Sequence, residues 1–225
     1  MSFNIAIDGP AGAGNSTIAK QLAKDLGVVY VDTGAMYRAF AYYFITNNIS
    51  AEDEAAISAA CPNVTISLTY EDGVQNVWLN GENVSSVIRQ EEVGKMASAT
   101  SVYPVVRTKL MELQQNLAKT TNVIMDGRDI GTVVLPNADV KIYLTATVEE
   151  RAKRRYMELI EKGQDADLEK IKEDIRTRDY QDMNRTAAPL KQAEDAVLID
   201  SSSMTIQEVL ECIVDAFQES LKLKG

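Results

Sequence analysis

Short apolar runs alternate with amphipathic segments over the first 48 residues. Residues 3–7 form a compact apolar run typical of a buried strand, and after Ser16 apolar residues recur at every fourth position, the spacing of one helix face. Residues 28–31 form a second apolar run, and Asp32 opens another helical pattern that continues toward Asn48. This strand–helix–strand–helix order predicts an α/β domain with a parallel sheet.

The pattern changes after Pro62. Residues 64–70 alternate between apolar and polar side chains, a turn follows at 71–73, and residues 74–79 return as a second alternating run. Asn80 and Gly81 are a strong hairpin signal. We therefore predict a small antiparallel β insert over 63–87.

The remainder of the chain returns to the α/β rhythm. A helical pattern continues to about Lys119, and no repeat, low-complexity tract or long linker follows it. We expect one core domain made of 1–62 and 88–225. Its later elements are predicted as strands at 123–125, 140–144 and 196–199, polar helices at 147–162 and 167–183, and an amphipathic helix at 206–221.

Composition narrows the chemistry. Of 225 residues, 45% are hydrophobic and 25% are charged, which is a globular balance, and the net charge of −10 argues against binding to nucleic acid or to anionic membranes. The chain has no histidine, so a Ser-His-Asp hydrolase and a histidine-ligated zinc enzyme are both excluded. Catalysis must rest on carboxylates, cations, backbone amides or a hard metal such as magnesium.

The termini and the longest apolar segment bear on location. The N-terminus has no cationic leader, and the longest apolar run, 39–45, is far shorter than the roughly 18 residues of a membrane span. The two cysteines, Cys61 and Cys212, are too isolated for a disulfide framework or a metal motif. We expect a soluble, cytoplasmic monomer that acts on small molecules.

The first motif with a chemical meaning is the glycine-rich segment 9–16. It fits the phosphate-binding loop G-x-x-x-x-G-K-[ST] at every fixed position except Asn15, which stands where that pattern has lysine. A strand precedes the loop and a helix follows it, so its N–H groups and the helix dipole point at an anion. The alternative is an ordinary glycine-rich turn between a strand and a helix.

A second motif, 32–38, also follows a strand and opens a helix. Thr33, Tyr37 and Arg38 are four or five residues apart and therefore face one way. A hydroxyl and a guanidinium at a helix start suit a second anion site. The alternative is a capped helix with a surface arginine.

A third motif, 126–132, begins with an acid at the end of an apolar strand. Asp126 in that position is similar to the Walker B carboxylate that holds magnesium, and Arg128 beside it is placed to bridge phosphates. A purely structural turn is the alternative.

The fourth feature is the concentration of arginine in the two polar helices. Arg151, Arg154 and Arg155 share one helix face, and a second face carries Arg178, Asp182 and Arg185. Either these are solvated, ion-paired helices, or they form a lid of about 147–185 that closes over phosphates.

Taken together, the motifs resemble those of the bacterial cytidylate kinases, within the P-loop nucleoside monophosphate kinases. The resemblance rests on IDGPAGAGxST at 7–17, DTGAMYRA at 32–39, MDGRDIGTVVLP at 125–136, EERAKRR at 149–155 and RDYQDMNR at 178–185. It implies a three-layer P-loop NTPase fold with a central parallel sheet, the antiparallel insert as a monophosphate-binding unit, and a helical lid. The implied reaction is transfer of a phosphoryl group from MgATP to CMP or dCMP.

The resemblance also implies residue roles. The ATP phosphates would be held by Gly9, Pro10, Ala11, Gly12, Ala13, Gly14, Asn15, Ser16 and Thr17, with Ser16 and Asp126 toward Mg²⁺. The CMP phosphate would be held by Thr33, Tyr37, Arg38 and Arg128, the cytosine by Ser98, Arg107, Asp129 and Arg185, and the ribose by Arg178 and Asp182. Arg151, Arg154 and Arg155 would form the lid, and these three would act in catalysis with Asn15, Asp126 and Arg128.

Asn15 departs from the pattern of that family. Asparagine has no charge and a shorter reach than lysine, so we expect the rate of phosphoryl transfer to suffer more than the fold. Two other functions stay open at this point. One is a catalytically silent nucleotide-binding protein, and the other is a small P-loop kinase for uridylate, thymidylate or shikimate, against which the pattern of Asp129, Arg178, Asp182 and Arg185 argues.

Overall fold

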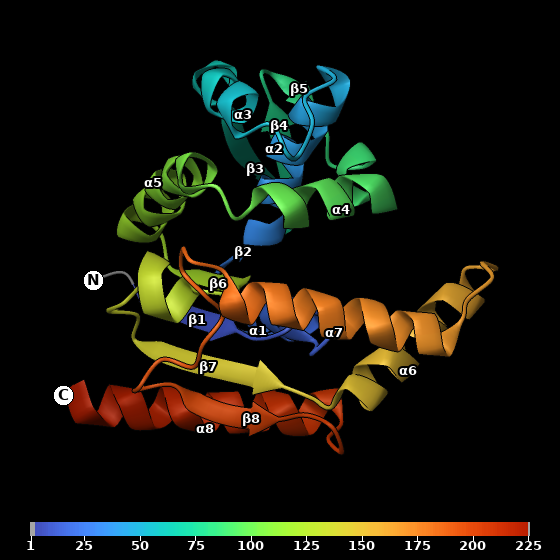
Figure 1. Ribbon diagram of the computed structural model, residues 1–225. Coiled ribbons are helices and arrows are strands. Elements are labelled where there is room, and N and C mark those ends of the chain that lie inside the picture. The colour runs from blue at the N-terminus through green and yellow to red at the C-terminus, as the bar shows by residue number, and fades with distance from the viewer. Residues whose placement is uncertain (1–2, 225) are drawn as a thin grey trace.

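A five-stranded parallel sheet lies at the centre of the molecule (Figure 1). The computed structural model describes residues 3–224, of which 221–224 are described by their backbone alone. The strand order is β2-β6-β1-β7-β8. The strands are β1 (Asn4–Asp8), β2 (Val29–Asp32), β6 (Val123–Gly127), β7 (Val140–Thr145) and β8 (Val197–Asp200). Their carboxyl ends meet at one edge, where Asp32 of β2 lies in register with Asp126 of β6.

Helices cover both faces of this sheet because successive residues of each buried strand face opposite ways. Ile5 and Ile7 of β1 pack in a cluster with α1 (Asn15–Leu26) and α8 (Ile206–Lys224). Ala6 between them belongs to a second cluster. That cluster contains α2 (Thr33–Thr46) and α5 (Pro104–Thr120). The result is the predicted three-layer α/β fold.

The predicted antiparallel insert is present. Its sheet consists of β3 (Ile66–Glu71), β4 (Val74–Leu79) and β5 (Glu82–Asn83), in that order. Asn80 and Gly81 both have positive φ, at 50° and 88°, which is the backbone that a two-residue hairpin turn requires. Around the sheet lie α3 (Glu54–Ala60), η1 (Cys61–Asn63), η2 (Val87–Arg89) and α4 (Glu91–Thr100).

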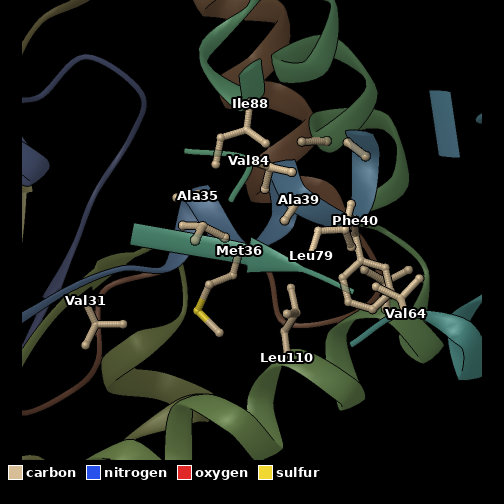
Figure 2. Close-up of a cluster of buried hydrophobic side chains, with 14 of the residues drawn as sticks. Val31, Ala35, Met36, Ala39, Phe40, Val64, Leu79, Val84, Ile88 and Leu110 are labelled. Carbon is tan, nitrogen blue, oxygen red and sulfur yellow. The ribbon is translucent and has the colours of Figure 1, made fainter. Parts of the chain in front are cut away.

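The insert shares its core with α2. Figure 2 shows Val64, Leu79, Val84 and Ile88 of the insert region converging on Phe40 and its neighbours from α2. These side chains form a single buried cluster that continues to the sheet. The assignment of 63–87 as a separate unit therefore stays a prediction, since its apolar side has no core of its own.

Two polar helices form a hairpin at the carboxyl edge of the sheet. They are α6 (Val148–Glu161) and α7 (Leu168–Asn184), and they lie within two residues of the predicted bounds. Figure 1 shows their connecting loop projecting to one side of the sheet. Within residues 3–224, none of the helices is long and apolar enough to cross a membrane.

Three features were not predicted. α3 was missed because its seven residues carry little periodic pattern. The helical stretch after the insert divides into α4 and α5, since Pro104 starts a new helix after an extended Tyr103. A π-helical turn, η3 (Ile130–Val134), follows β6 within the third motif, where no helical turn was predicted.

The shared core yields a stability prediction. Phe40 is 1% exposed and its ring centroid lies 5.9 Å from that of Phe44. F40A should lower the free energy of unfolding by about 3–5 kcal/mol, because it leaves a cavity beneath the insert. Urea denaturation measures this, with V74A at a 63% exposed position as the control. A loss for F40A no larger than that of the control would contradict the shared core.

Candidate active site

Two adjoining hollows open at the carboxyl edge of the sheet. One has a volume of about 250 Å³ and the other about 330 Å³. They share part of their walls, so groups bound in the two hollows would meet there. The shared lining residues are Ala11, Gly12, Ser16, Asp126 and Arg128.

The glycine-rich loop between β1 and α1 lines the larger hollow. A side chain at Gly9 would lie 2.0 Å from the carbonyl oxygen of Leu144, so only glycine fits. Gly14, which precedes the first turn of α1, has φ of 104°, a backbone conformation that side chains rarely adopt. The predicted phosphate-binding loop thus lies where its strand–loop–helix context placed it.

Asn15 folds back onto this loop. Its Nδ2 donates to the carbonyl oxygen of Gly9 at 3.1 Å, and the residue is only 5% exposed. The Oδ1 atom is buried and has no hydrogen-bond partner in the part of the chain that the structure describes. Asn15 therefore braces the loop but adds no charge to the hollow.

Ser16 and Asp126 meet beneath the loop. The Ser16 hydroxyl donates to Asp126 Oδ2 at 2.7 Å, and the Tyr30 hydroxyl donates to Asp126 Oδ1 at 2.8 Å. Burial, and secondarily the nearby charge of Asp32, raises the pKa of Asp126 to about 6. A bound cation would remove this penalty.

This pair fits magnesium. A hydroxyl and a carboxylate are hard oxygen ligands, and Mg²⁺ commonly takes one or two carboxylates and completes its shell with water and substrate phosphates. No cluster of three acidic, cysteine or histidine side chains suited to a metal occurs among residues 3–224. The donor set therefore suits a metal that arrives with a nucleotide.

The smaller hollow collects cations that lack an acidic partner. Arg38 donates to the carbonyl oxygen of Ile88 at 3.2 Å, and burial lowers its pKa. Burial and the neighbouring charge of Arg128 lower the pKa of Arg178 to about 10. Neither Arg38 nor Arg178 forms an ion pair with a carboxylate among the described residues. Uncompensated, largely buried guanidinium groups favour an anionic ligand.

Thr33 and Tyr37 complete this end of the smaller hollow. Thr33 Oγ1 donates to the backbone carbonyl oxygen of Asp126 at 2.6 Å, which fixes the start of α2 beside β6. The Arg107 guanidinium lies over the ring of Tyr37, with its Cζ atom 5.7 Å from the ring centroid. As predicted, Thr33, Tyr37 and Arg38 all face the same hollow.

Acids and arginines alternate at the opposite end. Asp129 accepts from Arg107 and, at 3.4 Å, from Arg185. Asp182 accepts from Arg128 Nε at 2.9 Å and lies 3.6 Å from Arg185. Ser98 lines the same hollow. The sequence placed Asp182 on one helix face with Arg178 and Arg185, and Asp182 pairs with Arg185 of that group and with Arg128, which follows β6.

The three arginines predicted to form a lid differ in setting. Arg151 is 4% exposed and donates to the carbonyl oxygen of Ala11 at 3.0 Å. Arg154 donates to the carbonyl oxygen of Ser201 at 2.7 Å. Arg154 also lies 3.4 Å from Glu150, and Arg155, the most exposed of the three, lies 2.7 Å from Glu158. All three line the larger hollow, so the interpretation as merely solvated helices does not describe Arg151.

Sequence reasoning missed several contributors. Arg89 of η2 lines the smaller hollow and lies 3.0 Å from Asp32. Nothing in the sequence marks a lone arginine in a short turn. Asp8 was detectable, since it ends a buried strand as Asp126 does. Its carboxylate accepts from the backbone N–H groups of Ile130 and Gly131, both at 2.7 Å, and so holds the segment after β6.

Comparison with known proteins shows the family to which this chain belongs. The model of the family "Cytidylate kinase" matches residues 5–219. A cytidylate kinase of Caldicellulosiruptor bescii is 52% identical over 220 residues, which cover 98% of this chain and 97% of the relative. The chain belongs to the cytidylate kinase family. A cytidylate kinase of Enterococcus faecalis is 49% identical, with 99% of this chain and 97% of the relative covered. As a member of this family, the chain is a nucleoside monophosphate kinase.

Solved structures show the fold alone. An uncharacterized protein from Eubacterium ventriosum aligns with a TM-score of 0.55 at 11% identity, over 96% of this chain and 99% of that one. A gluconokinase from Sinorhizobium meliloti aligns with a TM-score of 0.51 at 10% identity, over 99% and 96%. The three-layer core is thus common to proteins far from the cytidylate kinase family in sequence.

Asp8 gives the kinase a pH-dependent stability term. Burial raises its pKa to about 6 from 3.8, despite the two N–H groups that it accepts. Between about pH 4 and 6 the folded chain therefore holds a proton that the unfolded chain has lost, so this term destabilises the fold as pH rises. Its full size is on the order of 3 kcal/mol.

D8N should remove that term. Unfolding free energies at several pH values between 4 and 7 would show a shallower loss with rising pH in D8N than in the parent chain. The difference between the two slopes is the measurement, because all other acids are common to both proteins. If the unfolding free energies of D8N and the parent chain changed in parallel with pH, the raised pKa of Asp8 would be contradicted.

Proposed function

We propose that this chain transfers the γ-phosphoryl group of MgATP to CMP or dCMP. The observation that carries the proposal is the pair of adjoining hollows, one lined by a phosphate-binding loop and the other by paired acids and arginines. In-line transfer needs a donor and an acceptor held face to face, and the enzyme's contribution is mainly positioning and electrostatic stabilisation. The names of the relatives support the same reaction.

The larger hollow suits the ATP phosphates. The loop offers its backbone N–H groups at the start of α1, where the helix dipole also favours negative charge. Ser16 and Asp126 would hold the Mg²⁺ that accompanies ATP, and that ion would neutralise charge on the phosphate oxygens. Arg151, Arg154 and Arg155 approach the same hollow from α6.

The smaller hollow suits a cytidine monophosphate. Arg38 and Arg128, with Thr33 and Tyr37, would hold its phosphate next to the shared wall. At the far end Asp129 would accept from the cytosine amine, while Arg107 and Arg185 would donate to its ring nitrogen and carbonyl oxygen. Ser98 borders the base, and Arg178 with Asp182 would face the sugar.

We further propose that Asn15 lowers the turnover of this kinase. The side chain at this position contacts Gly9 and supplies no positive charge. The same observation favours a second candidate, a nucleotide-binding protein without catalysis. Formation of CDP from ATP and CMP at high enzyme concentration separates the two, since both would bind nucleotides and only a kinase makes CDP.

Base preference tests the acceptor site. CMP and dCMP should exceed UMP in kcat/KM by at least ~10²-fold, because uracil would leave buried polar groups of the site unpaired. D129N should narrow that preference, since an amide presents either a donor or an acceptor. A coupled ADP-release assay with CMP, dCMP, UMP and dTMP measures it. Equal use of UMP would contradict the roles of Asp129 and Arg185.

Placing a lysine at position 15 tests the donor site. N15K should raise kcat by about 10²–10³-fold, because it adds a preorganised cation where charge shifts during transfer. The KM for CMP should change little, since other residues hold CMP. N15Q, which lengthens the side chain without adding charge, is the matched control. A gain in N15Q equal to that in N15K would show that reach, and not charge, limits the rate.

A further inference from the structure

Arg151 is the most firmly held cation beside the phosphate-binding loop. Its Nε donates to the carbonyl oxygen of Ala146 at 2.9 Å and its Nη1 to that of Ala11 at 3.0 Å. Asp179 on α7 accepts from Nη1 at 3.0 Å and from Nη2 at 2.6 Å, which is a two-point pair. Four of the five guanidinium N–H donors are thus used, and one on Nη2 has no partner within residues 3–224.

Burial makes this arrangement unusually fixed for an arginine. The side chain of Arg151 is 4% exposed and that of Asp179 is 13% exposed. Arg155, by contrast, is 47% exposed and pairs with Glu158 one turn along its own helix. A two-point carboxylate pair sets the plane as well as the position of a guanidinium, which a single contact does not.

Asp179 also has an electrostatic cost. A carboxylate beside Arg151 offsets part of the positive charge that ATP phosphates would meet, so Asp179 weakens the general attraction for ATP. What the pair supplies is a fixed position and plane for Arg151, which borders the larger hollow. Fixed placement of this cation matters because Asn15 leaves the loop without a lysine.

α7 brings the two substrate sites together at this point. Arg178 and Asp182 line the smaller hollow, and Asp182 pairs with Arg128 at 2.9 Å. Asp179, one residue after Arg178, instead reaches Arg151 at the larger hollow. A shift of α7 on binding the acceptor nucleotide would therefore reach Arg151 directly.

We propose that Asp179 is a positioning residue that orients Arg151 against the phosphate-binding loop, where Arg151 supplies part of the positive charge that a lysine at position 15 would give and links it to acceptor binding. The proposal rests on the proposed function. Asp179 touches neither substrate in this scheme and acts only through Arg151. It predicts an effect on kcat that is separate from ATP affinity.

The first test is the kinetic profile of D179N. We expect kcat to fall about 10- to 100-fold, as for other misaligned catalytic groups, while the KM for ATP stays unchanged or falls because a negative charge has been removed. D179E, which keeps the carboxylate, should recover part of the loss. D174N makes the same charge change at an exposed position of α7 and should resemble the parent chain.

The second test combines D179N with N15K. If Arg151 substitutes for the lysine, D179N should cost less than about threefold in kcat once Lys is present at position 15. The two substitutions then interact and are not additive. An equal fold loss in both backgrounds would overturn the substitution of Arg151 for lysine. Parent-like kcat in D179N, or a fall in kcat matched by a proportional rise in the KM for ATP, would overturn the positioning role.

A binding measurement keeps the proposal separate from the proposed function. Calorimetry measures the Kd of a non-hydrolysable ATP analogue with and without CMP. CMP should lower this Kd several-fold in the parent chain and leave it unchanged in D179N. The same tightening in both proteins, or none in the parent chain, would overturn the link through Asp179. Absence of CDP formation under every condition would instead overturn the proposed kinase reaction, and the binding result would still decide on Asp179.

Discussion

Asp126 joins three elements at the carboxyl edge of the sheet. Its two carboxylate oxygens accept from Ser16 at the start of α1 and from Tyr30 of β2, and its backbone carbonyl oxygen accepts from Thr33 at the start of α2. Both helix starts are therefore fixed relative to the end of one buried strand. The rest of the site depends on this point, because Asp126 lies in the wall that the two hollows share.

Around that point the molecule keeps many charges out of bulk water. Asp129 and Asp182 each meet two guanidinium groups, while Arg38 and Arg178 are left without a carboxylate in the described part of the chain. Burying a charge without a partner is unfavourable, whereas a paired and hydrogen-bonded charge is tolerated. The paired groups thus hold the shape of the cavity, and the unpaired ones retain affinity for an anionic ligand.

Much of this could be predicted from local sequence pattern. Residues 3–7 and 123–125 are short apolar runs that end in acids, and the glycine-rich loop follows the first of them, so the parallel sheet and its functional edge were both predictable. The antiparallel insert was equally clear, because Asn80 and Gly81 satisfy a turn that few other residues can adopt. Such features depend on neighbours in sequence.

The pairings across the site were not predictable in the same way. Arg89 meets Asp32 over 57 positions and Arg151 meets Asp179 over 28, and nothing in the spacing of either pair distinguishes it from a surface ion pair. Helical periodicity grouped Arg178 with Asp182, yet the carboxylate of Asp182 pairs with Arg128, which follows β6. Which of several distant arginines a carboxylate pairs with is decided by packing, and a single sequence does not show packing.

The shared core under the insert bears on how modular this protein is. Val64, Leu79, Val84 and Ile88 bury the apolar face of α2, the helix that begins with Thr33 and presents Arg38 to the smaller hollow. A chain trimmed of residues 63–87 would therefore not become a smaller kinase with an open acceptor site. It would present the aromatic face of α2 to water, so any shortened descendant of this protein would first have to exchange Phe40 and its neighbours for polar residues.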